Sequence, residues 1–199
     1  TLLPEETIRE PYVDVVVRGM GEETLPELIE AWDMAKPLCD IKGVTFKDDS
    51  GFVSTIDREM PDINSFPSFD YTSFLPYKDK VVELPYISSR GCPWGCTFCV
   101  ASKLYKQRYF FYSAERMFEE IRKLSELFSC HRFVFWDDNL FVVKERLKRF
   151  CELLIEHKVK IKWSAFCHCD LFLKYEDALV ELMKEAGLDR VIRAGYELL

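Results

Sequence analysis

The feature that most constrains the fold of this chain is a regular alternation of strand-like and helix-like patterns that begins at Pro85. Short apolar runs typical of buried strands open near residues 85, 132, 160 and 190. The intervals from 132 to 160 and from 160 to 190 are 28 and 30 residues long, which leaves room for one helix in each connection, as parallel strands require. The spacing therefore predicts an α/β chain with a parallel sheet.

Helical patterns fill the gaps between these strands, and each has one apolar face at three- and four-residue spacing. The residues of the three faces are Met117, Ile121, Leu124 and Phe128; Leu147, Phe150, Cys151 and Leu154; and Leu179, Leu182, Met183 and Ala186. Gly187 is predicted to cap the last helix. Such units are typical of a partial parallel (β/α) barrel. Because the sequence stops at Leu199, just after the fourth strand, we expect the barrel to be truncated here and the natural protein to continue.

The first 80 residues are organised differently. A short buried strand is predicted at 13–17, followed by a turn and a helix in which Thr24 and Glu27 fit a capping box. The apolar face of this helix consists of Leu25, Leu28, Ile29 and Trp32. Residues 36–80 are rich in proline, serine and aspartate and contain one convincing strand, at 41–46, so they are interpreted as a surface connector.

Three cysteines follow the strand near residue 85, at C-x3-C-x2-C spacing: Cys92, Cys96 and Cys99. Glycine and proline residues between them allow tight turns. Three thiolates can bind one iron–sulfur cluster and leave one iron open to a substrate or cosubstrate. This loop is the strongest chemical signal in the sequence.

A structural zinc site is the alternative interpretation of the loop. Cys167, His168 or Cys169, at the end of the third strand, would complete its ligands. It is less favoured because structural zinc sites usually use paired C-x2-C motifs. His168 is otherwise interpreted as a hydrogen-bonded surface residue. The remaining cysteines are interpreted as core or partly buried thiols: Cys39, Cys130 and Cys151.

The cysteine loop, with the aromatic Phe98 directly before Cys99, resembles the signature of the radical S-adenosylmethionine (radical SAM) enzymes. The resemblance implies a partial (β/α)6 barrel whose first part is residues 81–199. It also implies a [4Fe–4S] cluster on Cys92, Cys96 and Cys99, with the open iron chelating the amino and carboxylate groups of SAM. One electron, from a donor such as flavodoxin or ferredoxin, would split SAM into methionine and a 5′-deoxyadenosyl radical, and Phe98 would lie against the adenine.

A finer resemblance covers the rest of the chain. Residues 13–24 are similar to the G-E-G-E-x-T stretch that closes the cobalamin-binding domain of cobalamin-type radical SAM proteins. Residues 135–146 resemble their second barrel strand and the turn after it, and Gly195-Tyr196-Glu197 resembles a G-x-E near the end of the fourth. The resemblance implies that residues 1–35 are the C-terminal end of a cobalamin-binding-like α/β domain, which the connector 36–80 joins to the barrel.

Some positions depart from the pattern of that family. Cys167-His168-Cys169-Asp170 stands where an Arg-x-Asp is frequent, and Met20 stands where a Glu is common. None of the three histidines lies in the D-x-H-x-x-G context that supplies an axial ligand to cobalamin. Cobalamin is therefore an inference about the parent protein.

Three carboxylates are predicted to contact SAM: Asp137, Asp138 and Glu197. They end the second and fourth strands at the face where barrel enzymes place their chemistry, and they could accept hydrogen bonds from the amino group or the ribose hydroxyls. The alternative for the two aspartates is a solvated turn in which one of them caps the next helix.

Composition narrows the choice of compartment and partner. No run approaches the roughly eighteen apolar residues of a membrane span, and residues 1–20 lack the features of a signal peptide, so a cytoplasmic location is expected. A net charge of −7 gives no overall electrostatic attraction to nucleic acid. A basic and aromatic stretch after the cysteines keeps an RNA substrate open without favouring it. Its members are Lys103, Tyr105, Lys106, Arg108, Tyr109 and Tyr112.

We therefore predict a radical SAM enzyme that acts on a small molecule, as a cobalamin-dependent methyltransferase or a ring-forming enzyme. One alternative is an RNA-modifying, methylthiotransferase-like enzyme, but that family has upstream cysteines for a second cluster, and here only Cys39 precedes Cys92. The other alternative is a non-catalytic, zinc-stabilised module.

Overall fold

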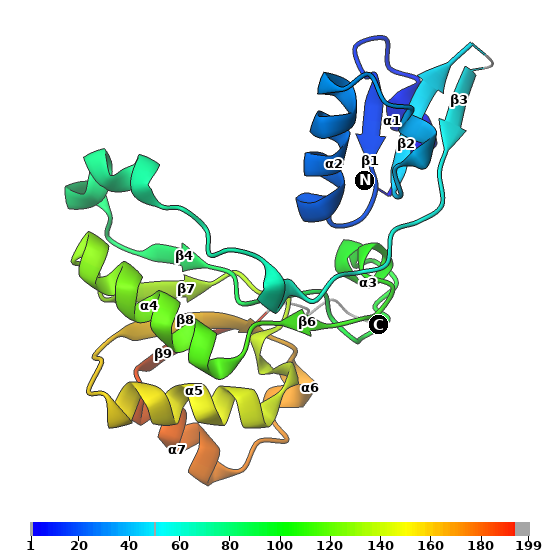
Figure 1. Ribbon diagram of the computed structural model, residues 1–199. Coiled ribbons are helices and arrows are strands. Elements are labelled where there is room, and N and C mark those ends of the chain that lie inside the picture. The colour runs from blue at the N-terminus through cyan, green and yellow to red at the C-terminus, as the bar shows by residue number, and fades with distance from the viewer. Residues whose placement is uncertain (1, 50, 194–199) are drawn as a thin grey trace. The chain divides into compact units, whose positions relative to one another are not determined.

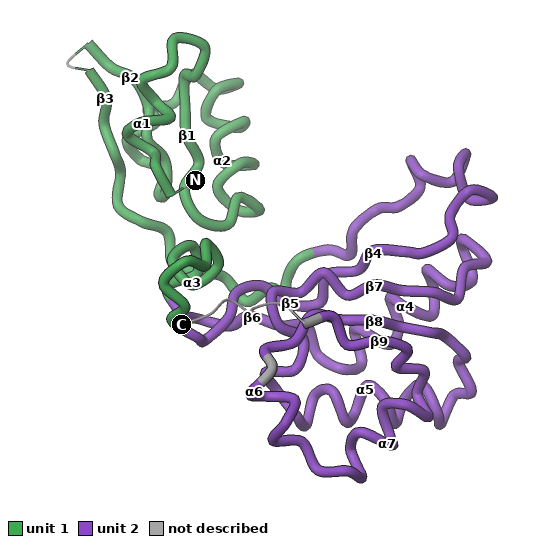
Figure 2. The backbone as a smooth tube through the Cα atoms, turned by 180° about the vertical axis from the view of Figure 1, so that it is seen from behind, with its two compact units in different colours: residues 1–66, 95–106 green, residues 67–94, 107–199 purple. Residues whose placement is uncertain are grey.

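The computed structural model describes residues 2–49 and 51–193, and the chain divides into two compact units. The first consists of residues up to Phe66 together with Gly95–Lys106, and the second of Pro67–Trp94 and everything from Gln107 onward. Figure 2 shows the two units in different colours. The chain thus enters the first unit twice, the second time with a segment that contains two of the three motif cysteines.

The first unit has a small antiparallel sheet of order β1-β2-β3. Its elements are the strands β1 (Val15–Val17), β2 (Val44–Asp48) and β3 (Gly51–Ser54), the helices α1 (Pro4–Ile8), α2 (Gly21–Asp33) and α3 (Val100–Leu104), and the 3-10 turns η1 (Leu38–Asp40) and η2 (Ile63–Ser65). Ala31, Ile41 and Val44 form a small buried cluster between α2 and the sheet.

The structure corrects the expected connector over 36–80. Residues 44–54 contain two strands instead of one, and β2 pairs with the predicted first strand, with Val15 opposite Phe46 and Val17 opposite Val44. The long-range pairing with β1 joins this segment to the N-terminal unit. Proline and serine content gave no sign of that pairing.

The start of α2 also differs from the prediction. The helix begins at Gly21, one turn before the predicted capping box, so Thr24 lies inside it. Thr24 is fully buried and its hydroxyl accepts a hydrogen bond from Arg58 Nε at 2.9 Å. Arg58 also forms ion pairs with Glu23 and Glu27, and these contacts tie α2 to the segment after β3.

The apolar face predicted for α2 is only partly buried. Leu28 packs against the small core, as expected. In contrast, Leu25, Ile29 and Trp32 are 50%, 54% and 65% exposed. Periodicity predicted a helix correctly here but could not show which part of its apolar stripe has a partner.

The second unit contains the predicted parallel sheet, of order β4-β7-β8-β9 (Figure 1). Its strands are β4 (Leu84–Tyr86), β7 (Arg132–Phe135), β8 (Lys162–Cys167) and β9 (Leu188–Arg193), and a separate short pair is β5 (Ser89–Arg90) with β6 (Phe110–Phe111). The helices are α4 (Ala114–Phe128), α5 (Lys144–Glu156), α6 (Cys169–Phe172) and α7 (Asp177–Glu185), and the 3-10 segments are η3 (Thr72–Lys80) and η4 (Leu140–Val142). The α/β class, the four strands and the three main helices are confirmed.

Large aromatic side chains join the sheet to its helices. Phe135 on β7, Phe150 on α5 and Trp163 on β8 are each at most 1% exposed. Their rings meet edge to face, with centroids 5.7 to 6.4 Å apart, a geometry that adds to the benefit of burying apolar area. This core fixes the carboxyl ends of β4 and β7, where the candidate site begins.

Gly187 ends the third helical unit as predicted. It follows the C-cap of α7 with φ +95°, a conformation that glycine adopts without strain. A Cβ at this position would lie 2.0 Å from the carbonyl oxygen of Ile161. The glycine is therefore needed for both the turn and the close approach of β8.

Candidate functional site

The three motif cysteines lie on a loop whose base is closed by two short strands. Ser89 pairs with Phe111 and Arg90 with Phe110 in the antiparallel pair β5–β6. The N–H of Tyr112 also donates to the carbonyl of Ser88 at 2.8 Å. We call residues 91–109 the cluster loop and the β5–β6 pair its stem. The stem follows directly from β4, so the loop begins at the carboxyl end of the parallel sheet.

All three motif cysteines are partly buried, and none of them forms a disulfide. Cys92 belongs to the second unit, whereas Cys96 and Cys99 belong to the first. The N–H of Cys99 donates to the carbonyl of Cys96 at 3.1 Å, and the Ser102 hydroxyl donates to both carbonyls at 3.2 and 3.0 Å. Ser102, on α3, thereby fixes the turn between these two cysteines.

The donor set suits an iron–sulfur cluster. Three thiols without disulfide partners, on a loop with room for tight turns, are the ligands that such a cluster requires. Within residues 2–49 and 51–193, no three His, Cys, Asp or Glu side chains are already grouped around a metal position.

The two predicted aspartates take different positions. Asp137 is 1% exposed and accepts hydrogen bonds from the Ser88 hydroxyl at 2.8 Å, the Ser88 N–H at 3.3 Å and the Ser89 hydroxyl. Asp138 is exposed and accepts from the N–H of Gly91 at 2.8 Å, one residue before Cys92. Both carboxylates therefore contact the base of the cluster loop.

Arg146, in the first turn of α5, lies beside Asp137. Burial raises the pKa of the Asp137 carboxyl, while the positive charge of Arg146 and the hydrogen bonds from both serines lower it. The guanidinium donates from Nη2 to the carbonyl of Ser88 at 3.1 Å and to its hydroxyl, and from Nη1 to Tyr109 Oη at 3.0 Å. Burial raises the pKa of Tyr109 to about 12, so this phenol stays neutral.

The remaining predicted SAM contacts are less defined. Phe98, the aromatic residue of the motif, is 63% exposed and so available to a ligand. Glu197 lies outside the described residues. The roles of Phe98, Asp137, Asp138 and Glu197 toward SAM stay predictions.

Three residues of this region have contacts that the sequence did not predict. Trp94, between Cys92 and Cys96, stacks on His168 with ring centroids 5.2 Å apart and an interplanar angle of 17°. His168 was expected to be a hydrogen-bonded surface residue, but its Nδ1 is buried and has no hydrogen-bond partner among the described residues. The third is Arg146, whose only signal was its place at the end of the family-like stretch 135–146.

The other thiols behave mostly as expected. Cys130 and Cys151 are 6% and 0% exposed in the core of the second unit. Burial raises the pKa of the Cys151 thiol to about 12. Cys39 is exposed, against the prediction of a core or partly buried thiol.

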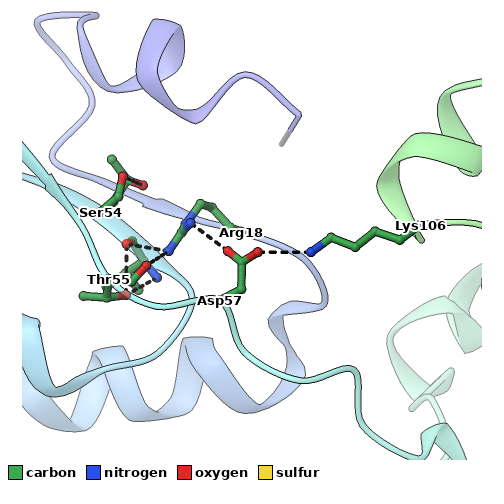
Figure 3. Close-up of polar contacts among 7 residues, drawn as sticks. Arg18, Ser54, Thr55, Asp57 and Lys106 are labelled. Atoms are coloured by element: carbon green, nitrogen blue, oxygen red, sulfur yellow. Dashed lines mark hydrogen bonds and ion pairs between the residues drawn. The ribbon is translucent and has the colours of Figure 1, made fainter.

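The far part of the cluster loop, by which we mean Gly95–Lys106 in the first unit, is held by ion pairs at the surface. Lys106 Nζ pairs with Asp57 at 3.1 Å, and Asp57 pairs with Arg18 Nη1 at 2.7 Å (Figure 3). Arg18 also donates to the carbonyls of Val44 and Thr55. The loop is thus tied to the end of β1 and to the segment after β3.

The radical SAM superfamily model matches residues 86–192, more than half of the chain, and includes the stem, the cluster loop, the parallel strands β7 and β8 in full and nearly all of β9. The chain belongs to the radical SAM superfamily. This confirms the family inferred from the cysteine loop.

Two curated relatives agree with this assignment. An uncharacterised methyltransferase of Pyrococcus horikoshii is 31% identical over 196 residues, which cover 96% of this chain and 42% of the relative. The anaerobic magnesium-protoporphyrin IX monomethyl ester cyclase of Cereibacter sphaeroides is 28% identical over 191 residues, 89% of this chain and 30% of the relative. The chain thus spans well under half the length of these relatives.

Solved structures share the fold. The cobalamin-dependent SAM radical enzyme OxsB with aqua-cobalamin bound matches 96% of this chain and 29% of its own, with a TM-score of 0.77 and 22% identity. The radical SAM methyltransferase TsrM of Kitasatospora setae with cobalamin and a [4Fe–4S] cluster bound gives 0.78, with 15% identity over 96% of this chain and 40% of its own. At these identities the two matches show that the fold is shared. Among the described residues, no helix is long and apolar enough to cross a membrane.

Proposed function

We propose that this chain is the cluster-binding part of a radical SAM enzyme that uses cobalamin to methylate, or to close a ring on, a small molecule. The observation that carries the proposal is the three-cysteine loop at the carboxyl end of β4, inside the region that matches the superfamily. When bound, a [4Fe–4S] cluster supplies the electron that splits SAM into methionine and a 5′-deoxyadenosyl radical.

The residues of the chain have distinct tasks in this proposal. Cys92, Cys96 and Cys99 would be the three thiolate ligands of the cluster, which would bind SAM through its amino and carboxylate groups. Phe98 is exposed and offers a flat face to the adenine. One carboxylate oxygen of Asp138 accepts a hydrogen bond from the Gly91 N–H. Because the side chain is exposed to solvent, it can also accept a hydrogen bond from SAM.

The names of the relatives support methyl transfer and ring formation. They include a hopanoid C-3 methylase of Methylococcus capsulatus, 25% identical over 184 residues, besides the methyltransferase and the cyclase described above. A small-molecule substrate, an electron donor such as flavodoxin or ferredoxin, and a cytoplasmic location belong to the same proposal. Cobalamin would be bound by the parent protein.

An RNA substrate is less favoured by the local structure. The aromatic side chains of the basic stretch would have to present open faces to stack on bases. Tyr105, Tyr109 and Tyr112 are instead all half-buried, and Tyr109 stacks on Phe111 with ring centroids 5.4 Å apart. The positive charge of Lys106 is paired with Asp57.

The test is anaerobic reconstitution of the full-length protein that contains this chain. We expect roughly four iron and four sulfide per chain and reductive formation of 5′-deoxyadenosine from SAM. Cys96→Ala should lose both, whereas Cys39→Ala, which changes an exposed thiol outside the motif, should keep both. Equal iron and sulfide in wild type and Cys96→Ala, or a colourless protein that contains zinc, would contradict the proposal. Cobalamin is checked by its absorbance in the protein isolated after growth with it.

A further inference from the structure

Four buried polar side chains of the second unit lie together at the base of the cluster loop. Ser88, Ser89, Asp137 and Arg146 are 0%, 2%, 1% and 6% exposed. They come from the strand segment before Cys92, the turn after β7 and the first turn of α5. Buried charges are costly unless they are paired and hydrogen-bonded, so such a group indicates a specific task.

The carboxylate of this group, Asp137, and that of its exposed neighbour, Asp138, hold the chain that leads into Cys92. Asp137 accepts three hydrogen bonds from Ser88 and Ser89, and Asp138 accepts one from Gly91. Two neighbouring side chains of one turn therefore hold both ends of the four-residue segment 88–91. Gly91 has φ +82°, so the Asp138 contact fixes the one residue of this segment that glycine leaves conformationally free.

Arg146 connects the two sides of the stem. Its Nη2 reaches Ser88, on the chain entering the cluster loop, and its Nη1 reaches Tyr109, the last residue of the loop. The guanidinium also lies 5.3 Å from the centre of the Phe111 ring, on β6. A planar group with donors in a fixed fork can hold both sides in one geometry, which a lysine at this position could not do.

We propose that Asp137 and Arg146 are positioning residues for the cluster, which set the path of the chain into Cys92, and that Asp137 acts on the loop and does not contact SAM. The inference rests on the proposed function insofar as Cys92 is a cluster ligand. Residues that orient metal ligands through hydrogen bonds typically change metal affinity by 10- to 100-fold when they are replaced.

The experiment compares Asp137→Asn with Ser125→Ala in the full-length protein. The asparagine keeps the shape of the side chain and one acceptor oxygen for the two serine hydroxyls, but its amide nitrogen cannot accept the hydrogen bond from the Ser88 N–H and carries no negative charge. Ser125, on α4, is 5% exposed, and its hydroxyl is hydrogen-bonded to His131 Nδ1 at 2.7 Å. Ser125→Ala therefore removes a hydrogen bond of a buried side chain in the same unit, away from the cluster loop. Ser89→Ala, which removes one donor to Asp137, is the milder second variant in case Asp137→Asn does not fold.

After anaerobic reconstitution, we expect Asp137→Asn to lose iron to a chelator at least about tenfold faster than wild type, and Ser125→Ala to lose it at the wild-type rate. The affinity for SAM of Asp137→Asn molecules that retain the cluster should be unchanged. The proposal would be overturned if both Asp137→Asn and Ser89→Ala lost iron to the chelator at the wild-type rate. Normal iron retention with tenfold weaker SAM binding would instead show direct contact with SAM.

A second measurement separates this inference from the proposed function. In the cluster-free protein, we expect Asp137→Asn to speed alkylation of Cys92 several-fold while Cys99, held by Ser102, reacts at the wild-type rate. If the wild-type protein takes up no iron–sulfur cluster, the proposed function fails, and this alkylation pattern still decides whether the buried group sets the position of Cys92. Equal alkylation rates of Cys92 in wild type and variant would overturn the inference.

Discussion

The base and the far part of the cluster loop are stabilised in opposite ways. At the base, Asp137 and Arg146 are buried and hydrogen-bonded to the stem. At the far part, Lys106 reaches Asp57 across the surface, and the two side chains are 64% and 59% exposed (Figure 3). Buried charged groups are expensive to separate, whereas exposed ion pairs contribute little. The comparison indicates a rigid entry to Cys92 and a far part that can adjust when a cluster forms.

The largest effect is expected for Arg146→Met, which keeps the length of the side chain but leaves Asp137 buried without a positive charge beside it. The free energy of unfolding should fall by about 3–5 kcal/mol, measured by urea denaturation of the cluster-free protein. The control is Arg122→Met, which breaks exposed pairs with Glu119 and Glu126 on α4. That change should cost less than about 1 kcal/mol. Similar losses for both variants would remove the distinction between buried and exposed charges.

The pH dependence of stability should identify Asp137. Because its pKa is raised in the folded protein, the folded state favours the protonated carboxyl. The resulting stabilisation is complete below the pKa of the unfolded chain and is lost as the pH rises through the folded pKa. Asp137→Asn cannot ionise, so its free energy of unfolding relative to wild type should rise with pH over this window. A constant difference between the two proteins would contradict the raised pKa.

A smaller effect is expected where the chain passes from one unit to the other. Lys106 and Gln107 have φ values of +52° and +55°, in the left-handed region that non-glycine residues rarely adopt. Gln107→Gly should therefore increase the free energy of unfolding by about 1 kcal/mol. Arg108→Gly, at a neighbouring residue without positive φ, should lower it by about 0.5–1 kcal/mol. Destabilisation by both changes would argue against strain at this junction.

The smallest effect is expected for Lys106→Ala, which breaks the exposed pair with Asp57. The free energy of unfolding should change by less than about 1 kcal/mol, and by still less in high salt. Cluster content should stay at the wild-type level, because Ser102 and the stem remain. A loss as large as that for Arg146→Met would mean that the far part of the loop is as firmly fixed as its base.

The sequence predicted the elements whose signals are local. The 28- and 30-residue spacing and the apolar faces predicted the parallel sheet and the helices α4, α5 and α7, because a residue's face on a helix or strand depends only on its position in the repeat. It did not predict that residues 44–54 pair with β1, since that pairing joins segments far apart in the chain. Nor could it show that Ile29 and Trp32 are exposed, because periodicity does not report what covers a face.

The candidate site divides in the same way. The sequence by itself determined the family, because the spacing of Cys92, Cys96 and Cys99 identifies it, and the same three residues are the cluster ligands that we propose. Only the tertiary structure decided that Asp137 is buried under the loop while its neighbour Asp138 is exposed, and that Arg146 reaches both sides of the stem. Burial and hydrogen-bond partners depend on which segments meet in space. For this reason Asp137 and Asp138, which are adjacent in the sequence, differ in burial and in hydrogen-bond partners.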